Sequence, residues 1–171
     1  LFLGQVYTDA SLLFNQNEFS KNVISLIREV IRISKNLNKP VVLKLHPKEN
    51  HGSDPVLFRP YENLTHRKLL GAGIKESPND KIFIDHTDRW STYNLIEKST
   101  LAVTINSQSG LEAMLLGKEL ICCGNSYYEN LQSCNSVRDN KSLESTIKKV
   151  VVNGVKTNDQ SECWNFFDFI R

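Results

Sequence analysis

Polar side chains that could hold an anion stand where two apolar strand patterns stop. The first group is Lys44-Leu45-His46-Pro47, and the second is Asn106-Ser107-Gln108-Ser109-Gly110-Leu111-Glu112-Ala113. In open α/β sheets, ligands bind beyond the carboxyl ends of the strands, so polar groups at two such ends predict one shared crevice. The sequence therefore predicts an anion-binding site there.

The second group has the composition of a turn that leads into a helix. Ser107 or Ser109 can cap the helix, Gly110 lets a ligand approach the backbone, and the first-turn amides can face a phosphate. The alternative is that the serines only cap the helix and that Glu112 only complements its dipole.

In the first group, His46 comes directly after a strand, and Pro47 fixes the turn that aims its ring. An imidazole in the crevice could donate a hydrogen bond or a proton to a phosphate oxygen. Lys44 could instead face the opposite side of its strand, and a lone histidine is more often structural. The functional interpretation depends on both groups lying at strand ends of one sheet.

A third group, Gln5-Val6-Tyr7-Thr8-Asp9, lies at the end of the first strand pattern. A carboxylate at position 9 could act as a nucleophile or base toward an electrophilic sugar carbon. The alternative is an Asx-type turn residue.

The elements that must position these groups alternate between strand and helix along the whole chain. Strand patterns are predicted over residues 1–7, 41–45, 81–85, 101–105 and 120–123, and helices over 19–37, 61–70, 91–98, 109–116 and 142–152. An aromatic segment, Trp164 to Phe169, is expected to pack across the sheet. This alternation predicts an α/β fold with a doubly wound parallel sheet, Rossmann-like, as a single domain over residues 1–171.

Composition and charge exclude some classes of function. The chain has 171 residues, 40% of them hydrophobic, and a net charge of +2, which is too balanced for binding duplex nucleic acid or an anionic membrane surface. Cys122, Cys123, Cys134 and Cys163 are interpreted as reduced core thiols of a cytoplasmic protein. No membrane span or leader pattern is evident, and the opening on Leu1 within a strand pattern suggests a piece of a longer chain.

Taken together, the three groups resemble the motifs of the capsule polysaccharide biosynthesis protein family. The resemblance continues through Gly117-Lys118, which leads to Gly124 and Tyr127 or Tyr128. That family includes the β-Kdo glycosyltransferases that begin the lipid linker of bacterial capsules. The order and spacing of the motifs match from Leu1 to about Tyr128.

The resemblance implies the C-terminal, nucleotide-sugar-binding domain of a GT-B glycosyltransferase built from two Rossmann-like domains. In such an enzyme His46 and Pro47, with Ser107 and Ser109, would bind the phosphate of a CMP-activated sugar, Kdo or a related one. Glu112 would bind the ribose or cytosine region. Asp9 would be the catalytic carboxylate, with Gln5 orienting it and His46 assisting departure of the phosphate. The substrate-binding residues expected from this resemblance and from the motifs are Lys44, His46, Pro47, Asn106, Ser107, Ser109, Gly110 and Glu112.

The expected partners are a nucleotide-sugar donor, a glycan or glycolipid acceptor and the missing N-terminal domain of the parent chain, with no nucleic acid. No cofactor or metal is expected, because no Asp-x-Asp motif occurs and a monophosphate-activated sugar needs less charge neutralisation. The expected location is the cytoplasm, either free or peripheral at the inner face of the membrane. Two alternatives stay open: a GT-B-like transferase using CDP-glycerol or a UDP-sugar, and a non-catalytic domain that binds a glycan or a protein partner.

Overall fold

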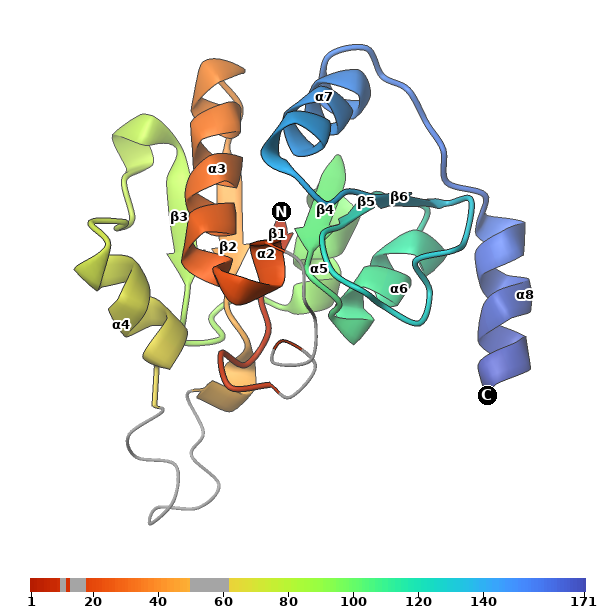
Figure 1. Cartoon of the computed structure of the whole chain (residues 1–171), viewed down its shortest axis with the longest axis horizontal. Helices are drawn as coiled ribbons and strands as arrows, with labels where there is room; N and C mark the ends of the chain where they lie inside the picture. Colours follow the sequence, from red (N-terminus) through yellow and green to blue (C-terminus); the bar gives the residue numbers. More distant parts are fainter. Residues whose placement is uncertain (10–11, 13–17, 50–61) are drawn as a thin grey trace.

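A single parallel sheet organises the chain (Figure 1). The computed structural model describes residues 1–9, 12, 18–49 and 62–171, and six strands occur within this part. They are β1 (Phe2–Leu3), β2 (Val41–Lys44), β3 (Ile82–Asp85), β4 (Leu101–Thr104), β5 (Glu119–Cys122) and β6 (Cys134–Ser136). Their order in the sheet is β3-β2-β1-β4-β5-β6, with every neighbouring pair parallel. This is the strand order of a Rossmann-like doubly wound sheet, so the predicted fold class is confirmed.

Helices cover both faces of this sheet. The described α-helices are α2 (Glu18–Lys21), α3 (Val23–Asn36), α4 (Leu64–Gly71), α5 (Thr92–Lys98), α6 (Gln108–Leu115), α7 (Asn140–Val151) and α8 (Gln160–Ile170), with 3-10 turns η1 (Pro47–Glu49) and η3 (Pro78–Asp80). In Figure 1, α3 and α7 lie over one face and α5 and α6 over the other. No helix in the described residues is long and apolar enough to cross a bilayer.

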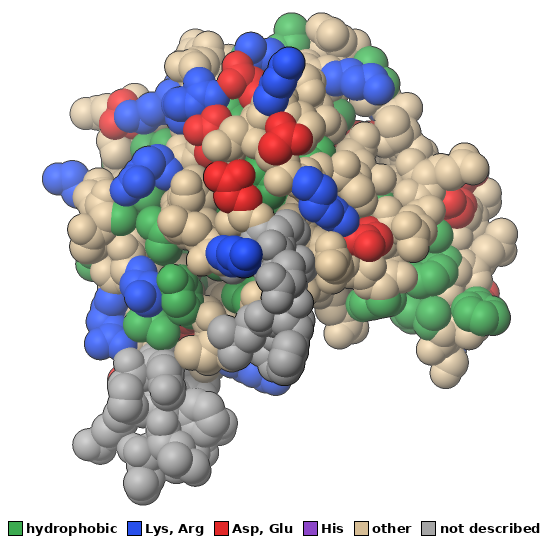
Figure 2. All heavy atoms as spheres, in the orientation of Figure 1, with side chains coloured by type: hydrophobic (Ala, Val, Ile, Leu, Met, Phe, Trp, Pro, Cys, Tyr) green, Lys and Arg blue, Asp and Glu red, His purple; other side chains and the backbone are tan. Residues whose placement is uncertain are grey.

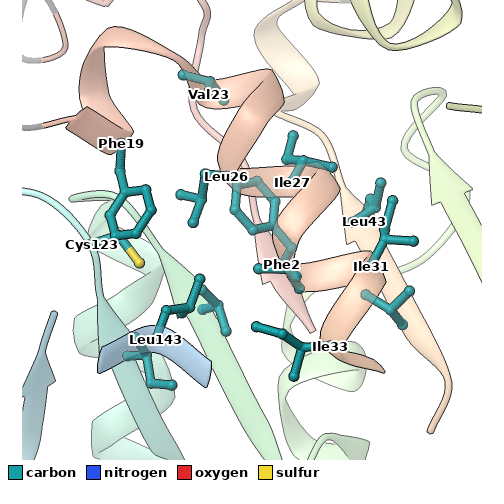
Figure 3. Packing of buried hydrophobic residues seen from close by; sticks show 14 of the residues in the cluster. Phe2, Phe19, Val23, Leu26, Ile27, Ile31, Ile33, Leu43, Cys123 and Leu143 are labelled. Carbon is teal, nitrogen blue, oxygen red and sulfur yellow. The ribbon is translucent and has the colours of Figure 1, made fainter. Parts of the chain in front are cut away.

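The strands are apolar on both sides because each face of the sheet is covered. Phe2 packs into one core cluster with α3 and α7, whereas Leu3 packs into a second cluster with α6 and Tyr128. Figure 3 shows Phe2 and Leu43 of the sheet beneath Leu26 and Ile27 of α3. Near-continuous apolar strands of this kind are expected in a parallel sheet.

Polar residues set where most of the helices begin. The side chain before α3, α5, α6, α7 and α8 accepts a hydrogen bond from the first turn, and these residues are Asn22, Ser91, Ser107, Asp139 and Asp159. Gly117, with φ of +71°, follows α6 in the left-handed conformation predicted for a glycine at that position.

Four elements differ from the sequence prediction, and one is the helix expected over 19–37, which is divided at Asn22 into α2 and α3. The first strand covers only Phe2–Leu3, and β6 was missed because three residues with one buried side chain carry little periodicity. The aromatic tail does not pack across the sheet: it forms α8, which lies against α6, buries Cys163 and leaves Phe169 87% exposed. The four cysteines are free and buried, as predicted.

Candidate functional site

A polar cleft of about 560 Å³ lies at the carboxyl ends of the central strands. The loops after β1, β2, β4 and β5 all contribute to its walls. Its lining residues are Gln5, Asp9, His46, Asn106, Ser107, Gln108, Ser109, Glu112, Asn125, Ser126 and Tyr127. The strand order reverses between β1 and β4, which is where open α/β sheets bind ligands. The two polar groups singled out in the sequence therefore share one crevice.

The amino end of α6 forms the part of this cleft best suited to an anion. Ser107 caps the helix, its Oγ accepting from the Ser109 backbone N–H at 3.3 Å. The Ser107 N–H donates to Thr104 Oγ1 at 3.2 Å, which ties the turn to the end of β4. A hydroxyl that accepts from the backbone keeps its own proton for a ligand, and the helix end carries a partial positive charge. Ser107 can thus both cap the helix and bind an anion.

Tyr128 supports this turn through a hydrogen bond from the protein interior. Its buried hydroxyl donates to the Ser107 carbonyl at 2.5 Å, and burial raises the pKa of this phenol above its usual range, so the group stays a donor. A Cβ on Gly110 would overlap the Tyr128 hydroxyl oxygen and approach Thr104 Cγ2 to 3.1 Å. Gly110 is itself buried, and Tyr128 occupies the space that a side chain there would need. The sequence had instead suggested this glycine as a point where a ligand approaches the backbone.

His46 enters the cleft from the end of β2 as a partly buried ring. Its Nδ1 accepts from the Lys48 backbone N–H at 3.2 Å, which leaves Nε2 as the protonated nitrogen of the neutral imidazole. Burial and the charge of Lys48 lower the pKa of His46, whereas the carboxylates of Glu49 and Asp9 act in the opposite direction. At neutral pH the ring is therefore an uncharged donor through Nε2–H.

The segment after β1 supplies Gln5 and Asp9. The Gln5 side-chain oxygen accepts from the Asn106 backbone N–H at 3.2 Å, which joins the ends of β1 and β4 across the point where the strand order reverses. Asp9 ends a turn in which its N–H donates to the Val6 carbonyl at 2.9 Å. Asp9 lines the same cleft as His46, and its carboxylate acts to raise the pKa of that imidazole.

Glu49 positions these groups and was missed by sequence reasoning. Its buried carboxylate accepts from the Tyr7 N–H at 2.8 Å, from the Thr65 N–H at 2.9 Å and from Thr65 Oγ1 at 2.7 Å. It therefore joins the segment that carries Asp9 to the turn after His46 and to α4. A charged residue in a polar stretch is normally expected to be exposed. The one feature of the sequence that could have indicated a role for Glu49 in the site is its position three residues after His46.

Lys44 and Pro47 do not line the cleft. The Lys44 ammonium is buried and donates to Asp85 Oδ2 at 2.9 Å, to the Trp90 carbonyl at 2.8 Å and to the Asp88 carboxylate. Both residues line a smaller neighbouring pocket of about 110 Å³, which also contacts His46, Ser107 and Ser109. Lys44 thus neutralises a carboxylate at the end of β3.

The cleft collects most of the residues expected to bind or act on a substrate. Those that line it are Gln5, Asp9, His46, Asn106, Ser107, Ser109 and Glu112, and those that do not are Lys44, Pro47 and Gly110. Sequence reasoning did not assign the loop after β5, which contributes Asn125, Ser126 and Tyr127. Among the described residues, no three His, Cys, Asp or Glu side chains are grouped to hold a metal ion. A separate, apolar cavity of about 270 Å³ lies at the amino ends of the strands, away from these groups.

Comparison with known proteins found a matching family profile and similar solved structures. The family profile described as "Capsule polysaccharide biosynthesis protein" matches residues 1–132. No curated protein sequence matches the chain. Among solved structures, the chain is similar to "KpsC, beta Kdo 2,7 transferase" from Thermosulfurimonas dismutans, with a TM-score of 0.51 and 20% identity over 84% of this chain and 42% of that one. A second match is "KpsC, beta Kdo 2,4 transferase" from the same organism, with a TM-score of 0.49 and 17% identity over 87% of this chain and 40% of that one. The chain spans less than half the length of either structure.

Proposed function

Because the chain belongs to the capsule polysaccharide biosynthesis protein family, we propose that it is the donor-binding part of a glycosyltransferase of capsule or surface polysaccharide synthesis. The donor in this proposal is a CMP-activated sugar, Kdo or a related one. The observation that carries the proposal is the cleft itself, in which the amino end of α6, His46 and Asp9 line one space.

The phosphate of the donor would bind between His46 and α6. Ser107 offers a hydroxyl and the helix end offers its partial positive charge, while His46 offers Nε2–H. When the bond between the anomeric carbon and the phosphate oxygen breaks, the electron pair leaves with CMP and negative charge grows on the phosphate. Groups fixed in advance around that oxygen stabilise the charge as it develops.

The sugar would lie toward Asp9. A carboxylate there can stabilise the positive charge that develops at the anomeric carbon, or can attack that carbon to form a covalent intermediate. The acceptor hydroxyl then forms the new bond to the anomeric carbon, and in the covalent case the bond to Asp9 breaks and the carboxylate is restored. The hydroxyl proton passes to a phosphate oxygen of the departing CMP or to solvent. Gln5 supports this end of the cleft by joining β1 to the Asn106 amide.

The remaining parts of the reaction would come from outside this chain. A GT-B site lies between two domains, so we propose that another domain of a longer parent protein supplies the surface for a glycan or glycolipid acceptor. No metal or cofactor has a role in this proposal, because a monophosphate leaving group carries less charge than a diphosphate. The proposed place of action is the cytoplasm or the inner face of the membrane.

Binding of CMP by the chain tests the donor assignment. Wild-type protein should bind CMP more tightly than UMP or CDP-glycerol in calorimetric titrations. His46→Ala should weaken CMP binding by roughly tenfold or more, since it removes the donor and a hydrogen bond to a charged group contributes about 1.5–3 kcal/mol. His66→Ala is the matched control, because that partly buried histidine lies on α4 and does not line the cleft.

The outcomes separate the candidate functions. A preference for CDP-glycerol or a uridine nucleotide would replace the CMP-sugar assignment, and absence of binding to any nucleotide would favour a non-catalytic domain. Asp9→Asn, made in the full-length protein, should abolish sugar transfer while CMP affinity is retained. Transfer at the wild-type rate by Asp9→Asn would contradict the catalytic role of this carboxylate.

A further inference from the structure

Tyr127 is an exposed aromatic ring on the wall of the cleft. It follows β5, lines the cleft beside Asn125 and Ser126, and is 55% exposed. The next residue, Tyr128, is 1% exposed and supports the turn of α6. The fold therefore directs one tyrosine of the pair into the core and presents the other at the site.

Two aromatic neighbours hold the Tyr127 ring in place. The Tyr128 ring meets it edge to face, with centroids 5.0 Å apart and planes at 76°. The Phe166 ring of α8 lies nearly parallel to it at 6.2 Å, with planes at 22°. A ring fixed by such contacts loses little conformational entropy when it binds a ligand. Phe166 lies outside residues 1–132, which the family profile matches.

α8 places further apolar side chains on this side of the molecule. Figure 2 shows hydrophobic groups gathered at the right of the view over α8, where Trp164, Phe169 and Ile170 are exposed. Of the aromatic residues near α6, Tyr127 is the one that lines the cleft. The Tyr127 ring is therefore placed to contact a ligand in the cleft, whereas the exposed side chains of α8 lie outside it.

The order of groups along α6 fits a nucleotide. Ser107 and Ser109 stand at the amino end of the helix, and Glu112 follows about one turn further, where a turn is roughly 5.4 Å long. Tyr127 and Glu112 line the same cleft, and burial first, and then the Glu112 carboxylate, raise the pKa of the Tyr127 phenol. Three kinds of group thus follow one another along one wall of the cleft: an anion site, a carboxylate that can accept from hydroxyl groups, and an aromatic face. Phosphate, ribose and base occur in the same order in a nucleoside monophosphate.

We propose that Tyr127, held by Phe166, is the platform on which the pyrimidine base of the donor nucleotide stacks. This inference rests on the proposed function and extends it, because it assigns the base to a wall of the cleft formed by the loop after β5 and supported by α8. Every base has an aromatic face, so stacking supplies affinity, while the choice among pyrimidines comes from the polar groups beside the ring.

Two ligands that differ only by the base test this assignment. CMP contains phosphate, ribose and cytosine, whereas ribose 5-phosphate lacks the base. In titrations followed by NMR, Tyr127→Leu should weaken CMP at least about fivefold, the lower end of what stacking of one base contributes, and should leave ribose 5-phosphate unchanged. Tyr127→Phe should keep wild-type affinity for both, because it retains the aromatic face.

Two further variants complete the experiment. Tyr93→Leu is the matched control, since Tyr93 on α5 is 54% exposed and does not line the cleft, and it should change neither affinity. Phe166→Ala should weaken CMP less than Tyr127→Leu does, because it frees the ring without removing it.

The results distinguish this inference from the proposed function. Wild-type protein that fails to bind CMP refutes the proposed function and the platform together. Wild-type binding that Tyr127→Leu leaves intact refutes the platform alone. Equal weakening of CMP and ribose 5-phosphate also refutes it, because the side chain would then support the shape of the cleft without contacting the base.

Discussion

Replacing Gly110 with alanine should damage the anion site through a residue that touches no ligand. The new Cβ would overlap the Tyr128 hydroxyl oxygen and would lie 3.0 Å from Tyr128 Cζ. Either Tyr128 or the first turn of α6 must move. Movement of Tyr128 breaks its hydrogen bond to the Ser107 carbonyl, which fixes the turn that faces the cleft.

The magnitude follows from three contributions. Overpacking a filled core costs about 1–3 kcal/mol. Loss of the hydrogen bond between buried partners adds about 1–3 kcal/mol, and the higher helix propensity of alanine returns about 1 kcal/mol. The free energy of unfolding should therefore fall by about 3 kcal/mol, which lowers the melting temperature by roughly 6–12 °C for a chain of this length.

Urea denaturation of a double-mutant cycle measures this effect. Tyr128→Phe removes the hydroxyl that the new methyl group would meet, so Gly110→Ala should cost at least about 1 kcal/mol less in that background. Gly71→Ala is the control, because a Cβ there has no atom within 4 Å and the variant should be neutral or slightly stabilising. If Gly110→Ala leaves stability unchanged, or costs the same in both backgrounds, the packing of Tyr128 against this glycine does not hold the turn.

Three further predictions distinguish residues that hold the cleft in shape from residues that bind the donor nucleotide. Lys44→Met should lower the free energy of unfolding in urea by about 3–5 kcal/mol, because the buried Asp85 carboxylate loses the ammonium 2.9 Å away and keeps the more distant Arg89 guanidinium, at 3.9 Å; a loss under about 1 kcal/mol would contradict the pairing with Lys44. Glu49→Gln should cost about 1–3 kcal/mol and weaken CMP in calorimetry, since its amide group would face a backbone N–H such as that of Tyr7; unchanged affinity would mean that Glu49 does not position the cleft. The ratio of wild-type to His46→Ala affinity for CMP should rise as pH falls through the lowered pKa of His46, because the imidazolium attracts the phosphate more strongly than the neutral ring does. A ratio that does not change with pH would exclude this contact.

Sequence periodicity was sufficient to predict those features that depend on neighbouring residues in the chain. Alternating strand and helix patterns predicted the doubly wound fold, and the helix caps and Gly117 followed from residue preferences at helix ends. The placement of His46 and Ser107 after strands predicted that they share a crevice. That inference holds because all strands of a parallel sheet end at the same edge.

The site residues that the structure places outside the cleft are ones whose surroundings depend on a distant neighbour. Lys44 was assigned to the substrate, but its ammonium pairs with Asp85, which lies on the adjacent strand and 41 residues away in sequence. Gly110 was interpreted as a point of ligand approach, and the structure fills that space with Tyr128. Nothing in the local pattern around Glu49 signals that its carboxylate is buried.

The amino-acid sequence by itself determined the kinds of element, their order and the chemical groups at the strand ends, because these depend on local periodicity and turn preferences. The tertiary structure decided which charges are neutralised in the interior and which face the cleft. It also brought β1 beside β4, so that Gln5 meets the backbone of Asn106 across a gap of 101 residues. Such contacts depend on strand order and helix packing, and these are set by the burial of two apolar faces of the whole sheet and not by any one segment.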